Sequence, residues 1–541
     1  MKKICRILFL ALLCFASLSA DAGEVVIVAA SPGYYTSLSR HIARWLKGQS
    51  VPSVLSSPST MKADLSDAKI AFLVGFANPG EREMASFRSF RKRGGKLVVF
   101  HTAAPELAAL MGVKVLGYKA ESYPGQWSRM NFAVNFPEGL PTSIRQSSTV
   151  LQRALPIAGK GRVLATWSDR SGKSTGDAAW IGTSAGFWMT HVLLADGDEE
   201  EKAQLVAAFV GSIAPNLWNY KSFLQRRNAE KARIRQIALA QVPRKGEIHA
   251  VWDHSGCGIY PGDWPRTIKL LQEARVTDLF VNVAGAGFAH YNSSVLPRSK
   301  RFEQEGDQLK ACLNAAKGSG IRIHPWILCF NATRATPAVL AAYKKRGWCL
   351  TNEKGESTEY LDPSNPQVRN LILTAIDELQ TKYRVNGIHL DFVRWYERSN
   401  RPRNAADVIS RFVADARRRI MRPNWFTVAV LGKYPSCVAA VGQDWYGWLD
   451  SNLVDYVVPM DYTEDLSQFE SYLKQHAATR SNALRTIAGI GVTANESRLD
   501  AAQVIKQISL ARKYRLAGVA LFDLDVVLEK NILPYLQLGI W

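Results

Sequence analysis

Cysteine is scarce in this chain of 541 residues, which has seven, and none stands between Cys14 and Cys257. So few cysteines exclude a disulfide framework as the main support of the fold, and no Cys/His spacing of a zinc finger occurs. Collagen repeats and coiled-coil heptads are absent as well. Beyond the first residues, no apolar run reaches the roughly 20 residues that a membrane-spanning helix needs. These absences favour a globular protein held together by apolar cores.

Acidic residues are few relative to basic ones: 47 Asp and Glu stand against 68 Lys and Arg, a formal net charge of +21. An excess of this size indicates an anionic partner, such as an envelope polymer. The 47% hydrophobic and 21% charged residues are typical of a folded protein and exclude a disordered one. The length predicts two or three domains.

Residues 1–22 have the pattern of a secretory signal peptide: a basic start, an apolar stretch of roughly twelve residues, and two sites suited to cleavage. The pattern comprises Lys2, Lys3 and Arg6, the apolar run 7–18, and the small residues of Leu18-Ser19-Ala20 and Ala20-Asp21-Ala22. We therefore expect an exported protein, periplasmic or extracellular, without a transmembrane segment after cleavage. Cleavage removes three basic residues and one acidic residue, leaving a charge of +19 and an odd number of cysteines, five. Export argues against nucleic acid as a partner.

Residues 23–218 alternate short β-branched runs with amphipathic stretches. The pattern predicts strands over 24–30, 69–74 and 94–100, and helices over 39–46 and 81–93. This rhythm predicts an open α/β sheet covered by helices on both faces.

The same segment resembles the class I glutamine-amidotransferase-like fold, on residues 94–101 (Gly-Gly-Lys-Leu-Val-Val-Phe-His) and 105–113 (Pro-Glu-Leu-Ala-Ala-Leu-Met-Gly-Val). The resemblance implies a nucleophilic cysteine on the turn after the strand, because a thiolate attacks the amide. The turn here reads His101-Thr102-Ala103-Ala104. We therefore expect a degenerate binding or packing module without that chemistry, in which His101 is structural.

Residues 219–245 are strongly basic. Glu230 is the one acidic residue of the segment, which has eight basic ones: Lys221, Arg226, Arg227, Lys231, Arg233, Arg235, Arg244 and Lys245. The segment predicts a solvated linker helix that ends before Pro243, and a patch for an anionic polymer is the alternative.

Residues 246–541 contain eight strand candidates separated by helical stretches. They cover 248–252, 279–283, 321–327, 387–391, 426–430, 455–460, 486–490 and 518–522. Eight βα units over about three hundred residues predict a (β/α)8 TIM barrel, and a doubly wound sheet is the alternative. The predicted fold class is thus α/β, with an open α/β domain followed by a barrel.

Acids and aromatic residues collect where these predicted strands end, which is where barrels carry their chemistry. Such a mouth suits a sugar, because rings pack on its C–H faces while carboxylates and amides bond its hydroxyls. Zinc is the competing ligand, since His254, His290, His324 and His389 all fall near the expected mouth. None of them shows H-x-H or H-E-x-x-H spacing, so no metal or cofactor is expected.

Four stretches of the second half resemble the glycosyl-hydrolase-like 10 proteins of bacterial envelopes. They are 387–394 (Gly-Ile-His-Leu-Asp-Phe-Val-Arg), 264–297, 360–369, and the pair 442–445 and 454–463. The resemblance implies a barrel that acts on glycans, with at least some relatives acting on peptidoglycan. The family 18 chitinase pattern would place a glutamate acid where Val393 stands, so a substrate-assisted mechanism is not expected.

The expected function is that of an exported glycoside hydrolase, with a polysaccharide or oligosaccharide as substrate and two carboxylates that cleave an O-glycosidic bond. Asp391 is the expected nucleophile or base, kept ionised by Arg394, and Asp461 or Glu464 is the expected acid. The other expected substrate-binding residues are Trp252, Asp253, Asn282, Trp326, Arg394, Trp395, Tyr462 and Glu496. The alternatives are a glycan-binding protein without catalysis and an envelope scaffold.

Overall fold

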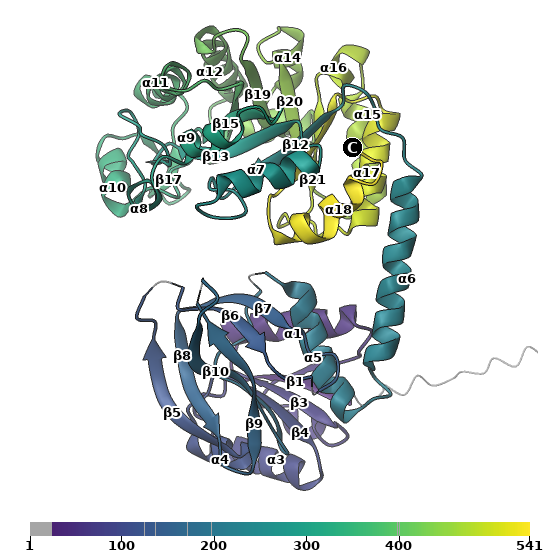
Figure 1. Cartoon of the computed structure of the whole chain (residues 1–541). Helices are drawn as coiled ribbons and strands as arrows, with labels where there is room; N and C mark the ends of the chain where they lie inside the picture. Colours follow the sequence, from purple (N-terminus) through teal and green to yellow (C-terminus); the bar gives the residue numbers. More distant parts are fainter. Residues whose placement is uncertain are drawn as a thin grey trace, which may run out of the picture. The chain divides into compact units, whose positions relative to one another are not determined.

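The computed structural model describes residues 24–123, 125–135, 137–169, 171–195, 197–397, 399 and 401–541 (Figure 1). The predicted signal peptide, residues 1–22, lies outside the described residues. The chain divides into two compact units, Met1–Ala229 and Glu230–Trp541. Each helix in the described part is either too short or too polar to cross a bilayer.

A nine-stranded sheet in the order β2-β1-β3-β4-β11-β10-β9-β6-β7 forms the centre of the first unit. Strands β2, β1, β3, β4 and β11 run parallel, and the remaining four run antiparallel. The strands are β1 (Val25–Ala29), β2 (Val54–Ser56), β3 (Ile70–Val74), β4 (Lys96–Phe100), β6 (Trp127–Phe132), β7 (Ser143–Ser148), β9 (Gly161–Ser168), β10 (Ser174–Thr183) and β11 (Gly186–Met189). A separate antiparallel pair consists of β5 (Val113–Ala120) and β8 (Val150–Pro156).

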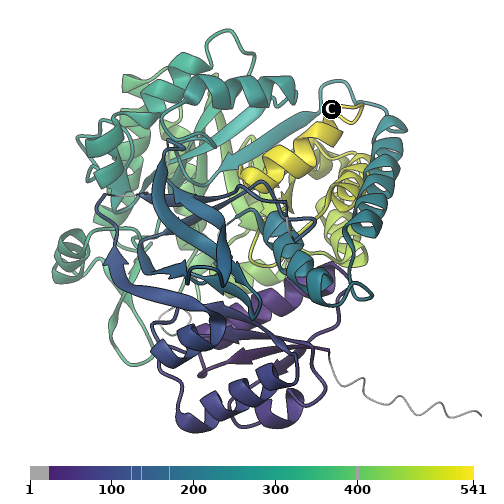
Figure 2. The same cartoon turned by 60° about the horizontal axis from the view of Figure 1, so that its bottom comes forward.

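Helices cover both faces of this sheet, as the alternating apolar strands predicted (Figures 1 and 2). One core joins Ile27 and Phe72 to α1 and α5, and a second core joins Val26 and Leu73, on the opposite face, to α2, α3 and α4. The helices are α1 (Tyr34–Gly48), α2 (Met61–Asp64), α3 (Glu81–Lys92), α4 (Pro105–Met111) and α5 (Glu199–Ile213). The prediction of an open α/β sheet is confirmed. The amidotransferase resemblance stays a prediction.

Helix α6 (Tyr220–Leu239) contains the boundary between the two units. It covers much of the basic segment. Within it, Arg233 pairs with Glu230 one turn earlier, Nη2 lying 2.6 Å from Oε1.

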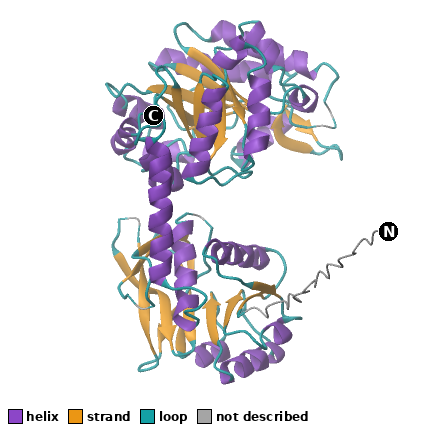
Figure 3. Ribbon diagram, turned by 90° about the vertical axis from the view of Figure 1, so that its right-hand side faces the viewer, coloured by secondary structure: helices purple, strands orange, loops and turns teal. Residues whose placement is uncertain are grey.

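Eight parallel strands close into a barrel in the second unit. Figures 1 and 3 show these strands surrounded by helices. They are β12 (Ile248–Asp253), β13 (Asp278–Gly285), β15 (Arg322–Leu328), β18 (Gly387–Asp391), β19 (Trp425–Leu431), β20 (Tyr456–Met460), β21 (Ile487–Gly491) and β22 (Gly518–Phe522). Because β12 pairs with both β13 and β22, the sheet has no free edge. The predicted TIM barrel is confirmed, and the doubly wound alternative is wrong.

Side chains alternate along the barrel strands between the interior and the surrounding helices. Trp252, Phe280 and Trp326 point inward and form one cluster, whereas Val251, Leu279 and their neighbours pack against the helices in another. The helices are α7 (Trp264–Glu273), α8 (Lys300–Glu305), α9 (Gln308–Ala315), α10 (Pro337–Lys345), α11 (Pro366–Lys382), α12 (Ala405–Arg419), α13 (Ser436–Val441), α14 (Trp445–Asp450), α15 (Leu466–His476), α16 (Arg480–Leu484), α17 (Ala501–Lys513) and α18 (Leu533–Leu536), with a π-helical turn at Leu528–Ile532.

Within the described residues, the barrel loops contain three short strands. Strand β14 (Phe288–Ala289) pairs with the end of β13, and β16 (Cys349–Thr351) pairs with β17 (Ser357–Leu361). The five cysteines of the described part, Cys257, Cys312, Cys329, Cys349 and Cys437, are all free thiols.

Candidate active site

Asp391 is the last residue of β18 and follows His389 on the inward-facing side of the strand. The residue is 5% exposed, and its Oδ1 accepts a hydrogen bond from the backbone N–H of Phe392 at 2.5 Å. Burial raises the pKa of Asp391, against the opposing effects of Arg394, the Phe392 N–H and Trp326. The sequence predicted an ionised carboxylate beside Arg394. Arg394 does oppose the effect of burial as predicted, but removal from water has the larger effect on the pKa of Asp391.

Aromatic rings form the floor below this carboxyl group. Trp252 is buried and donates its indole N–H to Nε2 of His389 at 2.9 Å. Nδ1 of His389 therefore carries the ring proton and donates to the Thr427 hydroxyl at 2.8 Å. Burial lowers the pKa of His389 well below its usual value, so this ring is neutral. Trp326 lies edge-on to His389, with ring centroids 6.1 Å apart. Two predicted binding residues, Trp252 and Trp326, thus meet inside the barrel.

Tyr462 lies among the acids of the mouth. Its ring stacks on Phe522 at 5.4 Å and stands edge-on to Trp252 at 6.5 Å. The pKa of Tyr462 is raised well above its usual value, first by burial and then by nearby negative charges from Asp391, Glu496, Asp523 and Asp461. The phenol therefore keeps its proton and can donate a hydrogen bond to a substrate hydroxyl.

Asp523 and Asp525 stand at the carboxyl end of β22, where the sequence showed two acids but the predicted site did not include them. Asp523 Oδ1 accepts a hydrogen bond from the Thr493 hydroxyl at 3.0 Å. Burial, followed by the charge of Asp525, raises the pKa of Asp523 to about 6. Burial also raises the pKa of Asp525. In the ring of strands, β22 is four strands from β18, so Asp523 and Asp391 belong to opposite sides of the barrel.

Asp461, the predicted partner of Asp391, has a different environment. It is fully buried, and Nε2 of His476 lies 2.9 and 3.0 Å from its two carboxylate oxygens. His476 belongs to α15 and packs against Trp445 of α14, which places this contact between the barrel and its helices. Gly432 leaves the space for it, because a Cβ there would lie 2.0 Å from Oδ1 of Asp461. Both oxygens are therefore engaged away from a substrate.

Three other predicted residues also make contacts within the protein. Glu464 is exposed and accepts from the backbone N–H of Arg498 at 2.9 Å. Asp253 is fully buried and accepts four hydrogen bonds from its own loop, donated by the backbone of Ser255, Gly256 and Gly258 and by the Ser255 hydroxyl. Trp395 is buried in a small cluster with Leu350, Ala405 and Val408. Glu496 is exposed, in the loop after β21.

Arg394, another of the predicted residues, follows β18 at the mouth. Its guanidinium carbon lies 4.1 Å from the centroid of the Phe392 ring. Its Nε is buried and has no hydrogen-bond partner among the described residues. The cation therefore stands beside Asp391 without being tied to it.

A second group of polar side chains lies on the β13 and β15 side of the mouth. It contains Asn282, which is fully buried on β13, and His290, which is in the following loop. It also contains Arg334 in the loop after β15, a residue that sequence reasoning missed. Arg334 Nη2 lies 3.2 Å from Nε2 of His290, and Nη1 lies 3.5 Å from Oδ1 of Asn282.

Among the described residues, His, Cys, Asp and Glu side chains form no group of three that could hold a metal ion. The four histidines are also more dispersed than the sequence suggested. Nε2 of His324 lies 2.8 Å from Oδ1 of Asp278, the first residue of β13, so His324 belongs to the amino-terminal end of the barrel and not to its mouth.

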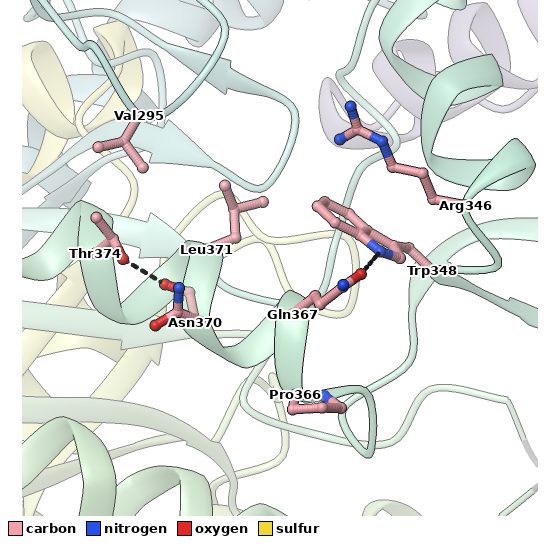
Figure 4. A pocket seen from close by; sticks show the side chains of 8 residues that line it. All are labelled: Val295, Arg346, Trp348, Pro366, Gln367, Asn370, Leu371 and Thr374. Atoms are coloured by element: carbon pink, nitrogen blue, oxygen red, sulfur yellow. Dashed lines mark hydrogen bonds between the residues drawn. The ribbon is translucent and has the colours of Figure 1, made fainter.

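A cavity of about 740 Å³ lies beside α11, on the helical layer of the barrel (Figure 4). Beside the cavity, Trp348 donates its indole N–H to Oε1 of Gln367 over a distance of 2.9 Å. The lining residues are Val295, Arg346, Trp348, Pro366, Gln367, Asn370, Leu371 and Thr374. None of the mouth residues lines this cavity, so we do not assign it to catalysis.

The fold and the mouth define a (β/α)8-barrel protein whose strands end in carboxylates and aromatic rings. Residues 263–401 match the family model of glycosyl hydrolase-like 10 proteins. No curated protein matches the chain.

Among solved structures, the chain is similar to a class V chitinase from Pseudomonas fluorescens Pf-5, with 12% identity and a TM-score of 0.37 over 55% of this chain and 100% of that one. It is similar to an endo-1,4-β-mannanase from Rhizomucor miehei, with 12% identity and a TM-score of 0.38 over 51% and 86%. It is also similar to α-L-fucosidase isoenzyme 2 from Paenibacillus thiaminolyticus, with 13% identity and a TM-score of 0.39 over 54% of this chain and 48% of that one.

Proposed function

We propose that this protein is an exported glycoside hydrolase that cleaves an O-glycosidic bond in a polysaccharide or cell-wall glycan. The observation that carries the proposal is the pair Asp391 and Asp523, two acids with raised pKa on opposite sides of the barrel mouth. The family match over residues 263–401 supports the same class of reaction.

Glycosidic cleavage needs one carboxylic acid that protonates the leaving oxygen and one carboxylate that acts as nucleophile or activates water. Asp391 is the more deeply buried of the two, and we assign it the proton-donating role. Asp523, with a pKa of about 6, is mostly ionised at neutral pH and takes the second role. Asp461 takes neither, because both of its oxygens contact His476.

The remaining mouth residues fit a sugar bound between these acids. Tyr462 keeps a phenol proton that can bond a hydroxyl, and the rings of Trp252, Phe522 and Tyr462 form an aromatic base for it. Aromatic rings and convergent polar groups are the usual composition of carbohydrate sites.

The substitution Asp391→Asn tests the proposal. It keeps the shape of the side chain and removes the transferable proton, so release of new reducing ends from a panel of polysaccharides should fall by at least about 100-fold. Asp461→Asn is the matched control, because it should lower the melting temperature through the His476 contact while leaving turnover per folded molecule unchanged.

Unchanged turnover in Asp391→Asn would remove the assignment of Asp391. If the wild-type protein binds glycans but releases no reducing ends from any of them, the protein is a glycan-binding protein and the proposed function is wrong.

A further inference from the structure

Arg334 is a cation without a counter-ion in the described part of the chain. Its guanidinium carbon lies 4.3 Å from the centroid of the Phe288 ring, and the side chain is exposed at the barrel mouth. No described carboxylate lies within ion-pairing distance of it, and no carboxylate is among the groups that shift its pKa. Other arginines of the barrel are paired, for example Arg322 with Asp278 at 2.6 Å and Arg417 with Asp455 at 3.0 Å.

His290 holds this cation in place. A guanidinium can only donate, so Nε2 of His290 accepts the hydrogen bond from Arg334 at 3.2 Å. The ring proton is then on Nδ1, which donates to the Ser299 hydroxyl at 2.6 Å. Burial and the charge of Arg334 lower the pKa of His290 to about 3, so the ring stays a neutral acceptor at ordinary pH. The cation is thus fixed by an aromatic face and a hydrogen bond, and its charge stays unneutralised.

Asn282 adds an unused hydrogen-bond donor beside the cation. The residue is fully buried, and its Nδ2 has no hydrogen-bond partner among the described residues. Its Oδ1 lies 3.5 Å from Nη1 of Arg334, so the amide and the guanidinium are neighbours. A buried donor without a partner is unfavourable, and in native proteins it often marks a place that a ligand completes.

We propose that Arg334 and Asn282 form a subsite that binds a carboxylate group on the glycan, so that the protein acts on an acidic glycan rather than a neutral one. The planar guanidinium fork matches a carboxylate, and the Asn282 amide offers a further donor. The subsite belongs to strands β13 and β15, and β15 is the neighbour of β18, which carries Asp391. This inference rests on the proposed function, since it names the substrate class of the same mouth.

Binding of one glycan in two forms tests the subsite. The full chain carrying Asp391→Asn, which is expected to bind without cleaving, is titrated with an acidic oligosaccharide and with the same oligosaccharide after its carboxyl groups are reduced to alcohols. A charge-assisted hydrogen bond predicts that the acidic form binds about tenfold tighter or more. One arm uses a uronic-acid oligosaccharide and a second uses one whose carboxyl group is on a lactyl ether, and a preference in either arm supports the subsite and identifies the carboxylate source.

Two substitutions then assign the preference to these residues. Arg334→Gln keeps a donor toward His290 but removes the charge, and Asn282→Asp places a competing carboxylate beside Arg334, so each should bring the ratio of the two affinities close to one. Arg346→Gln is the matched control, because Arg346 also lies over an aromatic ring, 5.0 Å from the centroid of Trp348, but lines the cavity beside α11. It should leave the ratio unchanged.

The outcomes separate the two proposals. Equal affinity for the acidic and reduced forms in both arms, or a preference that survives Arg334→Gln, overturns the subsite whether or not the wild type cleaves glycans. A preference that disappears in both variants supports the subsite even if the wild-type protein shows no turnover, an outcome that would overturn the proposed function alone.

Discussion

At the scale of single residues, burial governs the acids of the barrel mouth. Asp391, Asp523 and Asp525 each have a raised pKa with desolvation as the largest cause. A raised pKa means that burial favours the protonated form over the ionised one, so the folded state is penalised when the group ionises. The burial that raises these pKa values therefore costs stability once the groups ionise.

Asp523→Asn should separate these two effects. The folded pKa of about 6 lies above the unfolded value near 3.8, so the ionised group destabilises the fold increasingly as pH rises from about 4 to 6 and fully above that. The neutral variant should therefore gain up to about 3 kcal/mol in free energy of unfolding at pH 7 and nothing at pH 3.5. Its turnover should fall, and the limb of the wild-type rate profile that rises through pH 6 should disappear.

Chemical unfolding at the two pH values measures this gain. Glu353→Gln, which alters an exposed acid, is the control and should change stability at neither pH. An equal difference between wild type and Asp523→Asn at pH 3.5 and pH 7 would contradict the raised pKa.

How far sequence could predict the site is clear from three residues. The inward position of Asp391 could be predicted from the sequence, because alternation along a strand puts it on the same face as His389. Asp461 follows a strand in the same way, but its contact with His476 depends on where α15 folds back, which local patterns do not reveal. Arg334 is in a loop without periodicity, and its contacts are 44 and 52 positions away along the chain.

At the scale of elements, one buried carboxylate fastens a loop of the barrel to a helix. Glu378 on α11 accepts hydrogen bonds from the hydroxyls of Tyr291, Ser293 and Ser294 at 3.0, 2.5 and 2.7 Å, and Lys382 lies 2.6 Å away. Lys382 and the loop donors outweigh desolvation and lower the pKa of Glu378 to about 2. Tyr291, Ser293 and Ser294 come directly after His290 in the chain. The contacts with Glu378 therefore hold the loop that carries His290 against α11.

Glu378→Gln should weaken this attachment. A folded pKa of about 2 lies below the unfolded value, so the charge stabilises the protein above about pH 4.5 and this contribution is lost as pH falls toward 2. We expect a loss of about 1–2 kcal/mol at pH 7, after allowing for the partial exposure of Lys382, and a smaller loss at pH 3. Urea unfolding measures it. Glu303→Gln, at an exposed ion pair, is the control, and a loss as large in that variant would contradict a special role for Glu378.

Strands could be predicted from the sequence where their pattern of apolar residues is regular. The eight barrel strands are buried on both sides and read as continuous apolar runs, so their number and order followed from the sequence. Strands β5 to β10 were missed. Each of them includes exposed or half-buried residues, as in β5, where exposed and half-buried residues alternate after Val113, and such strands depend on distant partners for their pairing.

At the scale of the whole molecule, each unit encloses its own apolar core. Leu73 belongs to a core of the first unit, and Ile508 belongs to the core around the barrel, where α17 packs on the strands. Both residues are fully buried. A unit with a separate core has what it needs for a cooperative transition of its own.

Differential scanning calorimetry should therefore record two transitions, and one substitution in each core should assign them. Leu73→Ala and Ile508→Ala each remove buried carbon atoms at a cost of about 2–5 kcal/mol, which for units of this size lowers a melting temperature by about 5 °C or more. Leu73→Ala should lower only one transition and Ile508→Ala only the other. Loss of glycan binding on heating should follow the transition that Ile508→Ala lowers, because the candidate site belongs entirely to the barrel. A single transition that both substitutions lower equally would instead mean that the two cores unfold together as one cooperative unit.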